Sequence, residues 1–295
     1  MPLPKHGGAM ENTSEALAAT RNVNKRRMKV LGALFAIAIV IAGCSSSDSS
    51  SGDSTTTTTA APAPLKILVT NDDGFDSAGI DAVVEGLRTQ PNVEITVVAP
   101  ATNQSGKGGT VTGGTLTATD GKTKSGYPVK SVAGTPADSI VWALDQKGIS
   151  FTPDFVVSGI NAGQNMGSII DLSGTVGAAR AATQRGIPAI AASQGITDGK
   201  YDFPSGVQQV INWFKENRAR ISDKTIGTTT VTNMNIPTCP TGSVRGPKTV
   251  PVAPNADGYL NPPNCLSTMA DPTNDIMAFQ NGFAAISQIS PRPAS

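Results

Sequence analysis

Two adjacent aspartates directly follow the first strand-like segment of the chain. Residues 67–70 form a short apolar and β-branched run, and Asn71, Asp72, Asp73 and Gly74 come after it. Ligands of open α/β sheets bind at the carboxyl ends of the strands, and neighbouring carboxylates repel each other unless a cation compensates their charge. Gly74 allows a sharp turn that lets both acids converge. The motif predicts a metal site with both aspartates as ligands and catalytic groups; a solvated turn is the alternative.

Oxygen-bearing side chains also follow the next two predicted strands. Ser105 lies in the loop after strand 94–99, and Asn161 follows strand 154–158. Because these strands are expected to end at the same edge of the sheet, both residues should gather beside the two aspartates. All four ligand donors are oxygens and two are anionic. This set suits a hard divalent ion such as Mg²⁺ or Mn²⁺.

Glycine-rich segments at the same edge could bind an anion. Residues 100–110 leave backbone amides free, and Lys107 could add a positive charge. Residues 173–175, Ser-Gly-Thr, open a predicted helix, and helix N-termini favour anions. Taken alone, each segment is more often an ordinary loop or helix cap. The residues predicted to seat a substrate phosphate are Gly106, Lys107, Asn165, Ser173, Gly174 and Thr175.

Hydrophobic periodicity predicts the elements that position these residues. Ile80, Val83, Val84 and Leu87 fall at i, i+3, i+4 and i+7, which gives one apolar face of a helix between two strands. Such βαβ units imply a parallel sheet. The other expected elements are a small β segment at 111–134, a helix capped by Thr135, strand 188–192, helix 207–214, strand 228–237 and a closing β segment at 276–289. The pattern predicts an α/β fold with a mostly parallel sheet.

The N-terminal region has the composition of an export signal. Residues 21–29 are basic, and the apolar run at 30–42 has the length of a signal-peptide core. The run leads into Gly43-Cys44, and residues 41–44 resemble a bacterial lipoprotein cleavage box with Cys44 as the lipidated residue. An ordinary signal peptide is the alternative. We therefore expect a leader at 1–43 and a lipid-anchored protein on the extracytoplasmic side of the bacterial cell envelope.

The mature chain is expected to be one domain on a tether. Residues 44–64 are almost all Ser, Thr, Asp, Ala and Pro, which predicts a disordered linker. The domain covers 65–295, with a core at 65–237 and a C-terminal extension at 238–295. Six of the 23 basic and two of the 22 acidic side chains lie in the leader, which leaves 17 and 20 and a formal charge of −3. This charge weighs against binding of polymeric nucleic acid.

Cysteines and histidine restrict the chemistry further. Cys239 and Cys265 could form one disulfide, which fits an oxidising compartment, or remain two free thiols. His6, the only histidine of the sequence, lies in the predicted leader. Without it the mature protein has no imidazole, which excludes Ser-His-Asp hydrolysis, His-ligated zinc hydrolysis and phosphohistidine chemistry.

Six motifs follow one another along the predicted domain. They are Asn71-Asp-Asp-Gly74, Pro100 with Asn103-Gln-Ser-Gly106, Gly134-Thr-Pro-Ala-Asp138, Ser158-Gly-Ile-Asn-Ala-Gly-Gln-Asn165, Ser173-Gly-Thr-Val-Gly-Ala-Ala179 and Asn233-Met-Asn-Ile-Pro237. In this order, over about 170 residues, they resemble the SurE family of nucleotidases and phosphatases. The resemblance implies a Rossmann-like three-layer α/β sandwich with a mostly parallel sheet. It also implies a C-terminal β extension that commonly exchanges between subunits, and hence a homodimer or larger homo-oligomer.

The resemblance also implies the activity. Family members hydrolyse nucleoside 5′(3′)-monophosphates and related phosphomonoesters, so we expect a nucleotidase or acid-phosphatase-type hydrolase that depends on a divalent metal. Carried over by position, the metal ligands would be Asp72, Asp73, Ser105 and Asn161, and the segment 173–175 would help to seat the phosphate.

This chain departs from the family pattern at several positions. Arg180 and Leu172 replace the residues that the family usually carries there, and 238–275 matches poorly. These departures concern substrate preference and oligomer contacts, and they leave the metal site intact.

The expected reaction is metal-assisted hydrolysis of a phosphomonoester. The general base would be Asp72 or Asp73, or hydroxide held by the ion. An aspartyl-phosphate route fits less well, because Asp72-Asp73-Gly74 lacks the Asp-x-Asp-x-Thr layout. Two other functions remain open: a non-catalytic, envelope-tethered receptor for a phosphorylated ligand, and a dinucleotide-dependent oxidoreductase. The second fits poorly because no Gly-x-Gly-x-x-Gly follows the first strand.

Overall fold

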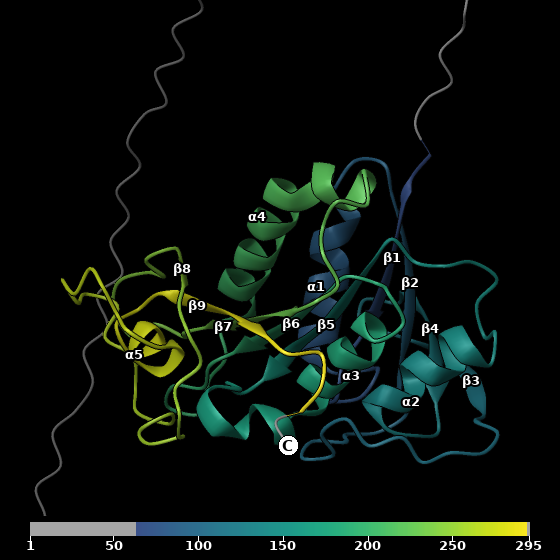
Figure 1. Ribbon diagram of the computed structural model, residues 1–295, viewed down its shortest axis with the longest axis horizontal. Helices are drawn as coiled ribbons and strands as arrows, with labels where there is room; N and C mark the ends of the chain where they lie inside the picture. Colours follow the sequence, from purple (N-terminus) through teal and green to yellow (C-terminus); the bar gives the residue numbers. More distant parts are fainter. Residues whose placement is uncertain (1–62, 294–295) are drawn as a thin grey trace, which may run out of the picture. The chain divides into compact units, whose positions relative to one another are not determined.

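One twisted sheet runs through the computed structural model, which describes residues 63–293 (Figure 1). Its strand order is β3-β4-β2-β1-β5-β6-β7-β9-β8. Neighbouring strands pair in parallel except at β3/β4 and β7/β9, which are antiparallel. The strands are β1 (Leu65–Thr70), β2 (Val93–Pro100), β3 (Ala118–Lys122), β4 (Pro128–Val132), β5 (Phe155–Ala162), β6 (Ala189–Gln194), β7 (Val231–Ile236), β8 (Pro247–Thr249) and β9 (Ala284–Ile289).

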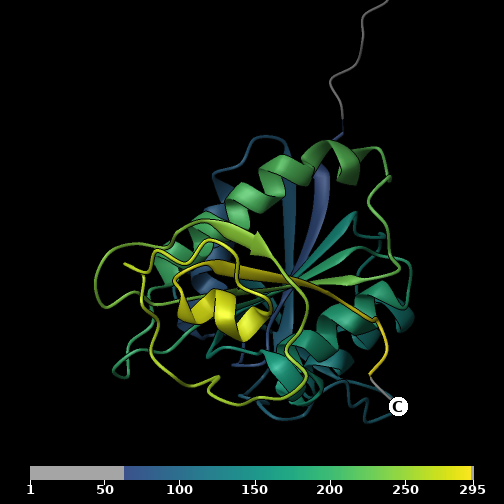
Figure 2. The ribbon, with the colours of Figure 1, turned by 60° about the vertical axis from the view of Figure 1, so that its left-hand side comes forward.

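Helices cover both faces of the sheet, so that the described residues form three layers (Figure 2). One apolar cluster lies beneath α1 and α4, and a second lies beneath α2 and α3 on the opposite face. The helices are α1 (Ala78–Arg88), α2 (Pro136–Ile140), the π-helix η1 (Val141–Asp145), the 3₁₀-helix η2 (Gly167–Leu172), α3 (Gly174–Thr183), α4 (Phe203–Ser222) and α5 (Asp275–Gln280). The predicted α/β sandwich with a mostly parallel sheet is confirmed.

Several predicted elements form where the sequence signals place them. The four apolar residues of the first helix face are fully buried in α1. Thr135 caps α2: its hydroxyl accepts from the Asp138 amide, and the Asp138 carboxylate accepts from the Thr135 amide. The small β segment at 111–134 becomes β3 and β4, which extend the main sheet beyond β2.

Strand β5 is longer than expected. The sequence predicted a strand only to Ser158 and a glycine-rich turn from 159 onward, but β5 continues to Ala162 across an irregularity between Ser158 and Asn161. Gly159 has φ +134°, and a Cβ there would lie 2.3 Å from the Ala192 carbonyl oxygen. A glycine at this point therefore lets the strand continue beside β6, and it carries Asn161 on the strand itself.

The predicted closing β segment at 276–289 is wrong in its first half. Residues 275–280 form α5, and only Ala284–Ile289 is a strand. The Asn274 side chain accepts from the Met277 amide and caps the helix, while Ile276 and Phe279 are buried at the i, i+3 spacing of a helix face. The apolar residues of this stretch suggested a strand, although Asn274 is a typical N-cap residue that marks the start of a helix.

The expected leader and Cys44 lie outside the described residues, as does most of the tether. Residues 63–293 belong to one compact unit. None of the helices in this part of the chain combines the length and the apolar character needed to span a bilayer.

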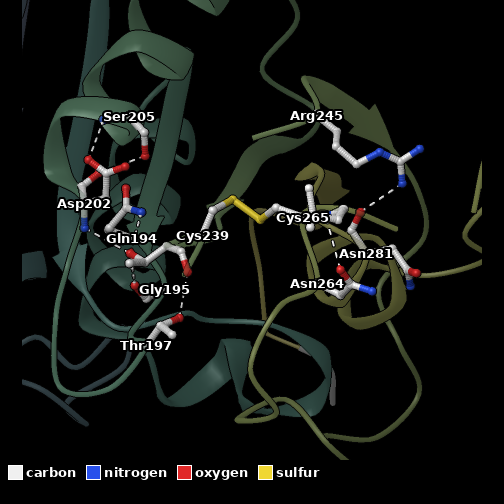
Figure 3. Close-up of a disulfide and its surroundings, with 12 residues drawn as sticks. Gln194, Gly195, Thr197, Asp202, Ser205, Cys239, Arg245, Asn264, Cys265 and Asn281 are labelled. Carbon is white, nitrogen blue, oxygen red and sulfur yellow. Dashed lines mark hydrogen bonds between the residues drawn. A yellow bond between two sulfur atoms is a disulfide. The ribbon is translucent and has the colours of Figure 1, made fainter. Parts of the chain in front are cut away.

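Cys239 and Cys265 form a disulfide, with their Cα atoms 5.7 Å apart (Figure 3). The bond joins the segment after β7 to the chain before α5. A separate apolar cluster, which includes Val250, Ile276 and Phe279, packs beneath this part of the molecule. The 238–275 segment, which gave few sequence signals, is thus held by a covalent bond and by a small core of its own.

Candidate active site

Asp72 lies at the carboxyl end of β1 and is buried. Its side chain is 2% exposed, and its Oδ1 accepts a hydrogen bond from the Thr175 hydroxyl at 2.6 Å. The turn that follows is closed by Asn71, whose Nδ2 donates to the Gly74 carbonyl at 2.7 Å and to the Ser77 hydroxyl at 2.8 Å. The side chain of Asp72 is therefore fixed by a residue 103 positions away in the sequence.

The N-terminus of α3 approaches Asp72 closely. Ser173 caps the helix by accepting from the Val176 amide at 3.1 Å. A Cβ on Gly174 would lie 2.8 Å from the Cβ of Asp72 and 3.0 Å from its Oδ2. Only glycine allows this contact, which brings the positive end of the helix dipole to the carboxylate.

Asp73 is held from the next strand. Its Oδ2 accepts from the Ala162 amide at the end of β5, at 2.9 Å. Among the described residues, its Oδ1 has one contact, a long one from Asn103 Nδ2 at 3.4 Å. One oxygen of Asp73 is thus firmly bound to the protein, and the other is left with weak hydrogen bonding.

The two carboxyl groups carry perturbed acidity. Burial raises the pKa of Asp72 from its ordinary 3.8 to about 6; the Thr175 hydrogen bond partly opposes this rise, and the charge of Asp73 adds to it. Burial also raises the pKa of Asp73, against the Ala162 hydrogen bond. Such raised values mean that the negative charge at this edge lacks compensation from the protein.

Ser105 and Asn161 are brought to the same edge. Asp72, Ser105 and Asn161 line one cavity of about 350 Å³, and Ala162, which binds Asp73, lines it too. The Ser105 loop is fastened by the Gln104 amide, which donates to the Asp72 carbonyl at 2.7 Å. The cavity thus brings together Asp72 from the end of β1, Asn161 from the end of β5 and Ser105 from the loop after β2, and Asp73 follows Asp72 directly.

These oxygens fit a hard divalent ion. Asn161 Nδ2 donates to the Gly163 carbonyl at 2.6 Å, so its Oδ1 is the free atom, and no hydrogen bond to it occurs among the described residues. The described chain contains no cluster of three or more His, Cys, Asp or Glu side chains, and the predicted set needs only two carboxylates beside an amide and a hydroxyl. Two under-compensated carboxylates with neutral oxygens nearby match the preference of Mg²⁺ or Mn²⁺.

The residues predicted to seat phosphate divide into two groups. Gly106, Asn165 and Ser173 line the cavity. Gly174 and Thr175 are buried against Asp72 instead, and Lys107 is exposed outside the cavity lining. Thr175 therefore orients a carboxylate, a contact that no local pattern predicts.

Asn165 is fixed by two neighbouring strands. Its Nδ2 donates to the Ser193 hydroxyl at 2.9 Å, and its amide donates to Asn235 Oδ1 at 2.7 Å. The Asn165 carbonyl accepts from the side chains of Asn233 and Asn235. The polar residues of β7 thus support this side of the cavity, a role that the motif at 233–237 did not specify.

Several lining residues were missed by the sequence reasoning. Gln164, Ile196, Tyr201, Tyr259 and Leu260 come from three loops and also line the cavity. Tyr259 and Leu260 belong to the 238–275 segment, where composition gave no element to build on.

Fold and site together define a Rossmann-like α/β protein with an acidic, oxygen-lined site at the carboxyl edge of its sheet. The family model described as "Survival protein SurE" matches residues 67–257. The chain belongs to this family, as its motifs predicted.

Curated relatives carry a more specific name. The 5′-nucleotidase SurE of Brevibacillus brevis is 36% identical over 187 residues, which cover 62% of this chain and 70% of the relative. The 5′-nucleotidase SurE of Treponema pallidum is 45% identical over 131 residues, 44% of this chain and 68% of the relative. A solved SurE structure from Aquifex aeolicus superposes with a TM-score of 0.61 at 26% identity and covers 78% of this chain and 95% of that one.

Proposed function

We propose that this protein hydrolyses nucleoside 5′(3′)-monophosphates or closely related phosphomonoesters. The observation that carries the proposal is that Asp72, Ser105 and Asn161 line one cavity, with Asp73 next to Asp72 and bound by the lining residue Ala162. The relatives named 5′-nucleotidase SurE support it, and the matched family model spans residues 67–257, which include all four residues.

A divalent ion, Mg²⁺ or Mn²⁺, would be held by Asp72, Asp73, Ser105 and Asn161. When bound, such an ion withdraws charge from a phosphoryl oxygen and makes water a better nucleophile. The protein's part is to keep the ligands in place: Thr175 orients Asp72, and the Ala162 amide orients Asp73.

The chain's own groups supply a base and an anion seat. Among the described residues, Asp73 Oδ1 receives one long contact, from Asn103, so this oxygen can still accept a proton from an attacking water. Asp72 Oδ1, by contrast, is occupied by Thr175. Gly106, Asn165 and the cap residue Ser173 line the cavity where the phosphate would sit.

The cellular setting is a further part of the proposal. A lipid anchor at Cys44 would hold the enzyme on the outer side of the bacterial membrane. The Cys239–Cys265 disulfide supports an oxidising compartment, because such bonds persist mainly in exported proteins. We expect a homo-oligomer, as the family resemblance implies.

Phosphate release from AMP by the purified protein tests the function. We expect release in the presence of Mn²⁺ or Mg²⁺ and its loss in EDTA, with recovery on adding metal. Asp73→Asn should abolish turnover and Lys107→Ala should leave it within about twofold, because Lys107 lies outside the cavity lining. Saturable binding of AMP without turnover would instead favour a receptor.

A further inference from the structure

A second cavity adjoins the Ser105 loop. It has a volume of about 390 Å³ and is lined by residues of α3 and of this loop, together with Arg185 and Pro293. Residues 109–111 of the loop border the second cavity, and Ser105 and Gly106 border the candidate active site. One loop therefore forms part of both walls. We call the second cavity the basic cavity.

The side chains that line the basic cavity give it a positive charge. Arg180 and Arg185 are among them, and no acidic side chain is among the described residues that line it. Arg180 is paired with Asp171 and Arg185 with Asp145, but neither aspartate belongs to the lining. Arg180 lies in the last turn of α3, where the helix dipole opposes an anion. That dipole is equivalent to about half an elementary charge, so two guanidinium groups outweigh it.

Arg180 is buried with more donors than the protein uses. It is 5% exposed; its Nε donates to the Ser290 carbonyl at 3.0 Å, and its Nη1 donates to Asp171 Oδ1 at 2.6 Å. A guanidinium carries five N–H groups, so three of them have no hydrogen bond among the described residues. Leaving donors of a buried cation unmet is costly, which indicates an acceptor inside the cavity that Arg180 lines.

The Ser105 loop adds uncharged donors. Gly109 and Thr110 line the basic cavity, and neither the Gly109 amide nor the Thr110 hydroxyl has a hydrogen bond among the described residues. The loop is fastened one residue earlier, where the Gly108 amide donates to the Leu172 carbonyl at 3.0 Å. A Cβ on Gly177 would lie 2.0 Å from the Gly108 carbonyl oxygen. The donors of the loop are therefore held close to α3.

We propose that the basic cavity binds a small oxyanion such as inorganic phosphate, and that its occupancy stabilises the Ser105 loop. A tetrahedral oxyanion can accept two parallel hydrogen bonds from a guanidinium and still accept from an amide and a hydroxyl. Ordered water is the alternative occupant, and it brings no compensating charge. The basic cavity is separate from the aspartate edge, so this inference does not depend on the proposed hydrolase activity.

Two connections link the basic cavity to the candidate active site. One is the loop itself, which runs from Gly106 in the active-site lining to Gly109 in the other. The second is Asp171, which binds Arg180 and lies two residues before Ser173, another residue of the active-site lining. An anion bound to the Arg180 guanidinium and the Gly109 amide would therefore hold the loop in one position.

Val111 offers a test that leaves both arginines in place. It lines the basic cavity and is 47% exposed, so substitutions there should preserve folding. Val111→Asp adds a carboxylate to the cavity, and Val111→Asn is the matched neutral control of the same size. The measurement is the Kd of the full-length protein for inorganic phosphate, by calorimetric titration in EDTA at constant ionic strength.

We expect the wild type and Val111→Asn to bind phosphate with a Kd of about 1 mM or tighter, and Val111→Asp to bind at least about tenfold more weakly because like charges repel. A folded Arg180→Met variant should not bind. Equal Kd values in Val111→Asp and Val111→Asn, or binding by Arg180→Met, would mean that phosphate binds elsewhere and would overturn the site. A wild-type Kd above about 20 mM would indicate an adventitious ion only and would overturn it as well.

Hydrogen–deuterium exchange in EDTA tests the link to the active site. Phosphate should slow the amide exchange of residues 105–111 at least about threefold in the wild type and in Val111→Asn, because an ordered loop opens less often. Exchange in Val111→Asp should not respond to phosphate. Phosphate binding that leaves the exchange of residues 105–111 unchanged in the wild type would overturn the link.

Discussion

Asp72→Asn should make the metal-free protein more stable while it removes most of the activity. The substitution keeps the size of the side chain and its acceptor for the Thr175 hydroxyl, but it deletes a buried charge. Burial raises the pKa of Asp72 from 3.8 to about 6. At 1.36 kcal/mol per pKa unit, this difference means that the ionised carboxylate lowers the free energy of unfolding by about 3 kcal/mol.

The sign of the effect follows from the direction of the shift. The folded state of the wild type binds the Asp72 proton more tightly than the unfolded state does. The stability associated with the protonated carboxyl is therefore complete below pH 4 and is lost as the pH rises through about 6. We expect the variant to be more stable than the wild type by about 1 kcal/mol at pH 4.5 and by up to about 3 kcal/mol at pH 8.

Urea unfolding in EDTA, followed by tryptophan fluorescence between pH 4.5 and 8, measures this difference. Asp145→Asn is the control of opposite sign, because the hydrogen bonds from Arg185 lower the pKa of Asp145. Added Mn²⁺ should stabilise the wild type and have little effect on Asp72→Asn. A variant that is less stable than the wild type at pH 8 in EDTA, or one with near-wild-type turnover, would refute the reasoning.

Three other perturbations test the supports of the site. Replacing Cys239 and Cys265 by serine opens a loop of sequence separation 26 and should lower the unfolding free energy by about 3.5 kcal/mol in urea titrations. Gly174→Ala puts a methyl group 2.8 Å from the Cβ of Asp72 and should lower kcat/KM about tenfold or more by displacing that carboxylate. Arg180→Ala removes a buried guanidinium bound to an η2 aspartate and to a carbonyl near the C-terminus, and should lower stability by about 2 kcal/mol.

Matched changes serve as controls for these variants. Gly227→Ala meets no atom closer than 3.8 Å and should behave as the wild type. Arg185→Ala should lower stability less than Arg180→Ala, because the Arg185–Asp145 pair is more exposed to solvent. Adding a reductant to the wild type should lower its stability by the same amount as replacing Cys239 and Cys265 by serine. A larger loss of kcat/KM in Gly227→Ala than in Gly174→Ala would contradict the assigned contacts. So would a larger loss of stability in Arg185→Ala than in Arg180→Ala.

The sequence alone predicted those features that depend on residues close together in the chain. Asp72 and Asp73 could be chosen as candidates because a short apolar strand ends in two acids and a glycine, and the ends of parallel strands share one edge. The capping box of Thr135 and Asp138 lies within four residues and was equally visible. The alternation of predicted strands and helices along the chain was enough to predict that the loops after the parallel strands lie at one edge of the sheet.

Contacts between residues far apart in the sequence, and irregular backbone, were not predictable from the sequence. Thr175 was assigned to phosphate because it opens a helix, and only the packing of α3 against β1 turns its hydroxyl toward Asp72. The end of β5 was misplaced because continuing a strand through Gly159 depends on the neighbouring carbonyl in β6. Tyr259 lies at the cavity because the Cys239–Cys265 disulfide closes its loop and Gln164 donates to its carbonyl. Hydrophobic periodicity does not predict either contact.

Different supports hold the two sides of the candidate site. Asp72 and Asn161 stand at the ends of strands whose positions are fixed by backbone pairing across the sheet. Leu260 stands on a loop whose position depends on the Cys239–Cys265 bond. Because the two sides have different supports, opening the disulfide should raise KM for a nucleotide without altering the pH dependence that Asp72 imposes on stability. A shift in that pH dependence on reduction would mean that the loop carrying Leu260 and the residues around Asp72 unfold as one cooperative unit.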